Sequence, residues 1–156
     1  MYLFSALSHG VRDPVQRANV RALDQGTIYA LIAGTFTPFA FSVLEGWFRI
    51  WFLFLVWLAA AAGFYSKVFV KHRINNMNSA SYVLLGWIPS MVLLGYVSTA
   101  CFALMALGGV LYTVGTIFLH YDHRAWTFHA IWHVLVILAS ASHYIAVVVF
   151  VVLNSP

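Results

Sequence analysis

Charged side chains are scarce in this sequence: Lys, Arg, Asp and Glu make up 8% of its 156 residues, whereas hydrophobic residues make up 63%. Soluble domains carry roughly 25% charged residues, so the composition excludes an ordinary soluble protein. The single cysteine, Cys101, excludes an internal disulfide bond and a CxxC metal site. We therefore expect an all-α, polytopic transmembrane helix bundle.

Charges are absent over long intervals, and these intervals predict where the chain crosses the membrane. A helix needs about 20 mostly apolar residues to cross the hydrocarbon core. The uncharged intervals predict one integral membrane domain over residues 1–156, with a tight turn near Ser98 to Cys101. The expected spans are 1–10 (partial), 22–44, 50–69, 80–98, 102–119 and 128–152.

The basic residues predict how the helices are oriented. Seven of the eight lysines and arginines fall in alternate loops: Arg12, Arg17, Arg21, Lys67, Lys71, Arg73 and Arg124. Cytoplasmic loops carry an excess of such residues, so this side is expected to face the cytoplasm and the C-terminus to lie outside. The net charge of +4 thus indicates topology, and nucleic acid is not an expected partner.

Two histidines, His129 and His133, stand out in the last expected span, where residues 125–156 contain no Asp, Glu, Lys or Arg. Residues four apart lie on the same face of a helix, so the two rings can share one metal ion. A polar side chain is costly in lipid, and an intramembrane pair therefore indicates a functional site. A pair of hydrogen-bonded packing histidines remains the alternative, because His-x3-His also arises by chance.

The expected topology brings more polar residues to the same side of the membrane. His9 ends the partial span and Asp24 begins the next one, at a depth similar to that of His129 and His133. Three neutral imidazoles with one open position are the ligand set of many catalytic zinc sites, and nitrogen ligands favour zinc over calcium or magnesium. We therefore expect His9, His129 and His133 to bind zinc. Ser5 lies one turn from His9, and Asp24 can hydrogen-bond a water at the metal or act as its base, which makes these two the candidate catalytic residues.

Other polar residues of the last span are expected to have structural roles. His143 lies about 21 Å along the helix from His129 and so cannot share its metal. We expect His143, Ser140 and Ser142 to hydrogen-bond to neighbouring helices. Soluble metalloproteases place a Glu directly after the first His as the base, and this position is Ala130 here.

Three motifs in order resemble the hemolysin III family, the bacterial branch of the progestin and adiponectin receptor (PAQR) superfamily. They are Ser5-x3-His9, Leu23-Asp24-Gln25 followed by YALIAGTFTPF at Tyr29–Phe39, and the His-x3-His segment Phe128–Tyr144. The resemblance runs from about Phe4 to Val152. It implies a seven-helix bundle in the bacterial plasma membrane, from which this sequence lacks the first helix and most of the second.

The resemblance also implies a site and a set of functions. Zinc would lie near the cytoplasmic face on His9, His129 and His133, with Ser5 and Asp24 in the surrounding polar shell. The expected function is metal-dependent hydrolysis of lipid amides, similar to the ceramidase activity associated with the superfamily, with membrane lipids as partners. The alternatives are a non-catalytic receptor or sensor with structural zinc, and a pore-forming haemolytic protein. The sequence lacks the continuous polar face expected of an aqueous path, which argues against the pore-forming alternative.

Overall fold

The computed structural model describes Leu3, Leu7 and residues 10–69, 79–121 and 124–153. Regular structure within these residues is entirely helical, which confirms the expected all-α fold. The elements are α2 (Pro14–Val43), α3 (Gly46–Val68), α4 (Ser79–Leu93), α5 (Thr99–His120) and α6 (Trp126–Val147), and α6 continues as the π-helix η2 (Val148–Val152).

Most of these helices have the length and composition of membrane spans. Among the described residues, α2, α3, α5 and the segment Thr127–Val152 are long and apolar enough to cross a membrane, whereas α4 is a shorter apolar helix. α3 leaves large side chains such as Trp47, Trp51 and Leu55 exposed on the outside of the bundle. Apolar side chains on the outside are what a lipid environment requires.

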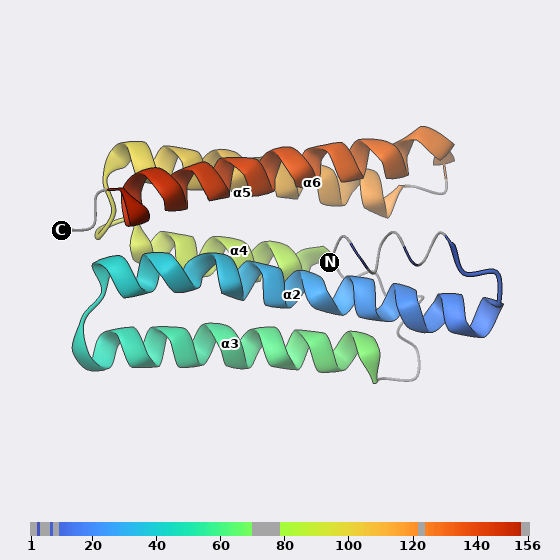
Figure 1. The fold of residues 1–156 in the computed structure, drawn as a ribbon, viewed down its shortest axis with the longest axis horizontal. Helices are drawn as coiled ribbons and strands as arrows, with labels where there is room; N and C mark the ends of the chain where they lie inside the picture. Colours follow the sequence, from blue (N-terminus) through green and yellow to red (C-terminus); the bar gives the residue numbers. More distant parts are fainter. Residues whose placement is uncertain (1–2, 4–6, 8–9, 70–78, 122–123, 154–156) are drawn as a thin grey trace.

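The helices run antiparallel along one axis and form three layers (Figure 1). α5 packs on α6, α2 packs on α3, and α4 lies between these pairs in contact with α2 and α5. The starts of α2, α4 and α6 and the ends of α3 and α5 meet at one end of the bundle, here called the basic end (Figure 1). It carries Arg17, Arg21, Lys67 and Arg124. That this end faces the cytoplasm stays a prediction.

Local capping explains where helices begin. α2 starts at Pro14, ahead of the expected span at 22–44, because the Asp13 carboxylate accepts hydrogen bonds from the amides of Val15 (2.7 Å) and Gln16 (2.9 Å). The connection between α4 and α5 covers residues 94–98, a few residues before the expected turn. The cause is Ser98, whose hydroxyl caps α5 by accepting from the amide of Cys101 at 3.3 Å.

Two glycines let α2 and α3 approach closely near the basic end. A Cβ at Gly26 would stand 2.9 Å from side-chain atoms of both Phe64 and Val68, and a Cβ at Gly63 would overlap the ring of Tyr29. The Tyr29 ring thus lies directly on the backbone of α3, a contact that only a missing side chain permits. The Tyr29 hydroxyl also hydrogen-bonds the Ser81 hydroxyl at 2.6 Å, which ties α4 to this crossing.

We expect Gly63→Ala to destabilise the bundle by about 1–3 kcal/mol, because the added methyl group must displace the buried Tyr29 ring. The measurement is thermal unfolding of the purified protein in detergent. Gly34→Ala is the matched control: Gly34 is also helical, but a Cβ there meets nothing within 4 Å. Its midpoint should stay level or rise, since alanine has the higher helix propensity. Equal losses in both variants would contradict the close-approach role of Gly63.

The α5–α6 interface is held by polar contacts as well as by packing. Ser142 donates to the carbonyl of Leu104 at 2.8 Å, and the Tyr112 and Ser140 hydroxyls bond each other at 2.7 Å. His143 Nε2 lies 3.0 Å from the carbonyl oxygen of Met105. The expected interhelical roles of Ser140, Ser142 and His143 are thereby confirmed.

Candidate metal site and internal cavity

His129 and His133 lie on successive turns at the start of α6, both half-buried. Their Nε2 atoms are 3.1 Å apart, and the two ring planes meet at 85°. Two imidazole nitrogens bound to one tetrahedral zinc at 2.0–2.1 Å lie about 3.3–3.4 Å apart. The pair therefore fits two ligands of one zinc ion with a shift of a few tenths of an ångström. Without metal, one Nε2–H donates to the other Nε2, so the same arrangement also serves a hydrogen-bonded pair.

Of the other expected site residues, the structure describes Asp24 but not His9 or Ser5. His9 and Ser5 lie outside the described residues, so their predicted roles as ligand and catalytic residue stay predictions. Asp24 lies on α2, with its Oδ1 atom buried. Within the described part of the chain, no three His, Cys, Asp or Glu side chains form a group that can hold a metal. Asp24 is thus not a third ligand beside the histidine pair, and its expected place in the polar shell stays a prediction.

Lys67 is buried in the fold, although its charge grouped it with the loop residues at the end of the expected span 50–69. Lys67 belongs to the last turns of α3, is only 5% exposed, and places Nζ 5.8 Å from the centre of the Tyr82 ring. The Tyr82 hydroxyl donates to the carbonyl of Gln25, the residue after Asp24, at 3.2 Å. A cation over an aromatic face is favourable, more so when both are shielded from water. The sequence offered no local signal for this burial, because it results from the close α2–α3 crossing.

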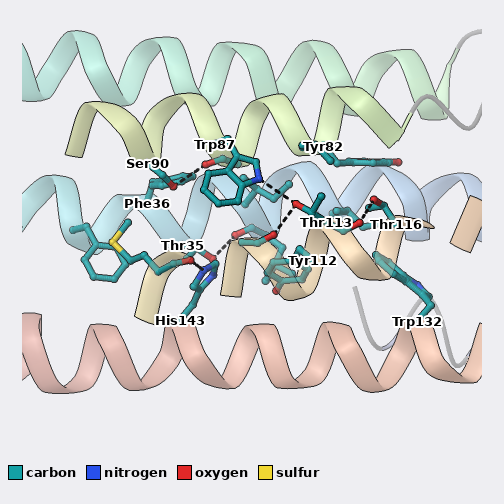
Figure 2. A pocket seen from close by; sticks show the side chains of 18 residues that line it. Thr35, Phe36, Tyr82, Trp87, Ser90, Tyr112, Thr113, Thr116, Trp132 and His143 are labelled. Atoms are coloured by element: carbon teal, nitrogen blue, oxygen red, sulfur yellow. Dashed lines mark hydrogen bonds between the residues drawn. The ribbon is translucent and has the colours of Figure 1, made fainter. Parts of the chain in front are cut away.

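A cavity of about 60 Å³ runs along the bundle between α2, α4, α5 and α6 (Figure 2). Trp132, between the two histidines in sequence, lines its near end, and His143 lines its far end. These two residues are eleven positions apart on α6, which corresponds to about 16 Å. The walls come from α2, α4, α5 and α6, and they include Ile28, Phe36, Tyr82, Trp87, Thr113 and Thr116.

The serine and threonine hydroxyl groups that line the cavity all donate within their own helices. The donor–carbonyl pairs are Thr35–Leu31 (2.8 Å), Ser90–Gly86 (2.8 Å), Thr113–Gly109 (2.7 Å) and Thr116–Thr113 (2.8 Å). Because these hydroxyl protons are already used, they are not available to a ligand, and the remaining wall is mostly aliphatic and aromatic. Cavities with such walls stay dry and take up apolar groups.

Neither the cavity nor the set of helices that encloses it was predicted from the sequence. The sequence does contain one indication of it, the spacing Gly86-x3-Ser90 and Gly109-x3-Thr113, in which a hydroxyl lies one turn after the glycine whose carbonyl accepts its hydrogen bond. This spacing indicates a narrow helix face but not which helix faces it.

Comparison with known proteins identifies the family. The model of the haemolysin-III-related family matches residues 1–144. The chain belongs to this family. The hemolysin-3 homolog of Bacillus subtilis (strain 168) is 36% identical over 97% of the chain and 72% of that protein, and hemolysin-3 of Bacillus cereus is 33% identical over 97% and 70%. The human monocyte to macrophage differentiation factor is 28% identical over 80% of the chain and 52% of that protein, which supports the superfamily link.

No solved structure matches this haemolysin-III-related chain. Family membership and the apolar helices together make it a membrane protein. The resemblance drawn from the three motifs is confirmed at the level of the family.

Proposed function

We propose that this haemolysin-III-related protein is a zinc-dependent hydrolase of lipid amides. The observation that carries the proposal is the approach of His129 Nε2 and His133 Nε2 to 3.1 Å on the same helix that contributes Trp132 to the wall of an apolar cavity. A hydrolytic site for a lipid needs a polar centre next to a place for a hydrocarbon chain. Trp132 joins the two here, since it lies between the histidines in sequence and lines the cavity.

In this proposal the site residues have different roles. His129, His133 and His9 hold the zinc ion, which when bound supplies the Lewis acidity that polarises an amide carbonyl and acidifies water. Asp24 takes the proton from the attacking water, and Ser5 orients the polar headgroup. Asp24 directly precedes Gln25, whose carbonyl accepts a hydrogen bond from the hydroxyl of Tyr82, a residue of the cavity wall. The cavity keeps the alkyl part of the substrate out of water.

The predicted orientation completes the proposal. The basic residues put the histidine end of the bundle at the cytoplasmic face of a bacterial plasma membrane. A lipid amide with its headgroup at that face would place its amide bond a short distance below the surface, at the level of the histidine pair.

The test is hydrolysis of a ceramide by the purified full chain in lipid nanodiscs. We expect turnover with zinc present, loss of turnover with a zinc chelator, and recovery when zinc is added back. Turnover that persists in chelator would contradict the proposal. Bound zinc and a chelator-dependent unfolding midpoint without any turnover would instead support the alternative of a sensor with structural zinc.

A further inference from the structure

The imidazole ring of His143 is held in one orientation among the side chains that line the cavity (Figure 2). Its Nε2 atom lies 3.0 Å from the carbonyl oxygen of Met105 on α5. A Cβ at Gly108 would overlap Nε2, so the ring lies directly on the backbone of α5. The ring of Tyr112 packs beside it, with the two ring centroids 5.7 Å apart. These contacts fix the position of the imidazole and the direction of both its nitrogens.

The contact with Met105 determines which ring nitrogen of His143 carries the proton. A carbonyl oxygen can only accept a hydrogen bond, so Nε2–H is the donor. Apolar surroundings favour the neutral imidazole, in which Nδ1 then has no proton and acts as an acceptor. Within the described part of the chain, no group donates to Nδ1. Protein atoms do not enclose Nδ1 completely, so a small molecule can reach it.

The hydroxyl groups of the cavity wall do not supply a proton to Nδ1. The serine and threonine hydroxyls donate within their own helices, and Trp87 Nε1 donates to Thr113 Oγ1 at 3.1 Å. The donor must therefore come from a bound molecule. A cation is disfavoured, because burying an unpaired charge among apolar side chains is costly. An amide brings a carbonyl that the wall hydroxyls cannot satisfy, whereas a hydroxyl group brings the one donor that is needed.

We propose that the cavity binds a small alcohol, whose hydroxyl group donates to Nδ1 of His143 and whose hydrocarbon part lies along the aliphatic and aromatic wall. The cavity volume of about 60 Å³ holds roughly four to six water-sized groups, which matches a five-carbon alcohol. The alcohol site requires neither zinc nor hydrolysis, since His143 lies about 21 Å along α6 from His129.

Two isomers test the proposal, because n-pentanol and methyl n-butyl ether contain the same atoms but only the alcohol has a hydroxyl proton. Binding to the full chain in lipid nanodiscs is measured by headspace gas chromatography, relative to partition of each compound into empty nanodiscs. We expect saturable binding of n-pentanol that is about two- to tenfold tighter than that of the ether, the range of one net hydrogen bond.

A second measurement reports on the acceptor itself. In nitrogen-15 NMR of the protein with labelled histidines, the Nδ1 resonance of His143 is identified by its absence from His143→Phe. Saturating n-pentanol should shift this resonance, and the ether should leave it in place.

Two variants should remove the preference for the alcohol. His143→Phe keeps an aromatic ring but has no acceptor, so it should bind the two isomers equally. Gly108→Ala adds a methyl group where Nε2 lies, so it should displace the imidazole and have the same effect. Thermal unfolding of each variant checks that it is folded.

Ser142→Ala is the matched control. Ser142 also donates from α6 to a carbonyl of α5, that of Leu104 at 2.8 Å, but it is not part of the described cavity wall. This variant loses the same kind of interhelical hydrogen bond and should keep the wild-type preference for the alcohol.

Equal binding of the two isomers to the wild-type protein would overturn the proposal, whether or not the variants fold. An Nδ1 resonance that stays in place at saturating n-pentanol would overturn it as well, as would loss of the preference in Ser142→Ala. The isomer comparison is repeated in His133→Ala, where the preference should persist. Failure of ceramide hydrolysis with an intact preference for the alcohol would reject the proposed function and leave the alcohol site standing.

Discussion

Replacing His133 by alanine is expected to abolish both zinc binding and lipid amide hydrolysis. His133 Nε2 lies 3.1 Å from His129 Nε2, so the two nitrogens can act as ligands of one zinc ion. Loss of residues that merely orient metal ligands already weakens binding by 10- to 100-fold, so loss of a ligand should cost at least about 100-fold in zinc affinity. The measurements are zinc per chain in the purified protein and ceramide turnover at saturating zinc.

His120→Ala is the control for this prediction. His120 ends α5 at the same end of the bundle but is exposed, so its removal should leave zinc content and turnover unchanged. One zinc per chain with wild-type affinity in His133→Ala would show that the pair is a hydrogen-bonded packing feature.

Asp24→Asn is expected to reduce turnover by about 100- to 10,000-fold while zinc stays bound, the range typical of losing a general base. Asparagine has the shape of aspartate but cannot take a proton at neutral pH. Because Asp24 is not grouped with the histidine pair as a metal ligand, the variant should separate chemistry from metal binding. The measurements are kcat with ceramide and zinc content, both on the same preparation.

Asp13→Asn provides the matched control on the same helix. It also removes a carboxylate, at the N-cap of α2, and asparagine is an equally good N-cap, so stability and turnover should both be kept. If Asp24→Asn lost zinc and turnover together, Asp24 would be a ligand or a structural residue. Full turnover in the variant would remove it from the mechanism.

Features set by local chemistry were predictable from the sequence. The all-α fold followed from the long uncharged intervals, because a backbone in lipid must satisfy its own hydrogen bonds. The convergence of His129 and His133 followed from the i, i+4 geometry of one helix. Neither result depends on how separate helices pack.

Features set by packing between helices were not predictable. Lys67 was grouped with the loop residues by its charge, yet it is buried on α3, the helix that Gly26 and Gly63 allow to approach α2 closely. His143 was expected to bond a neighbouring helix, but its partner, the Met105 carbonyl, depends on the space left by Gly108. The bond from Trp87 to Thr113 likewise joins residues 26 positions apart. Nothing in either residue's own neighbourhood specifies the other.

The hydroxyl groups of Thr35, Ser90, Thr113 and Thr116 in the cavity wall already donate hydrogen bonds, and this affects which end of an amphiphile enters the cavity. Thr35, Ser90, Thr113 and Thr116 all donate to carbonyls of their own helices, so these four side chains offer a headgroup no hydroxyl proton in exchange for its hydration. Burying an amide without such compensation is unfavourable by roughly 1–3 kcal/mol. An amphiphile placed tail first avoids that penalty, whereas the reversed pose incurs it in full. The wall therefore favours tail-first insertion, which leaves the polar end of an amphiphile outside the apolar part of the cavity.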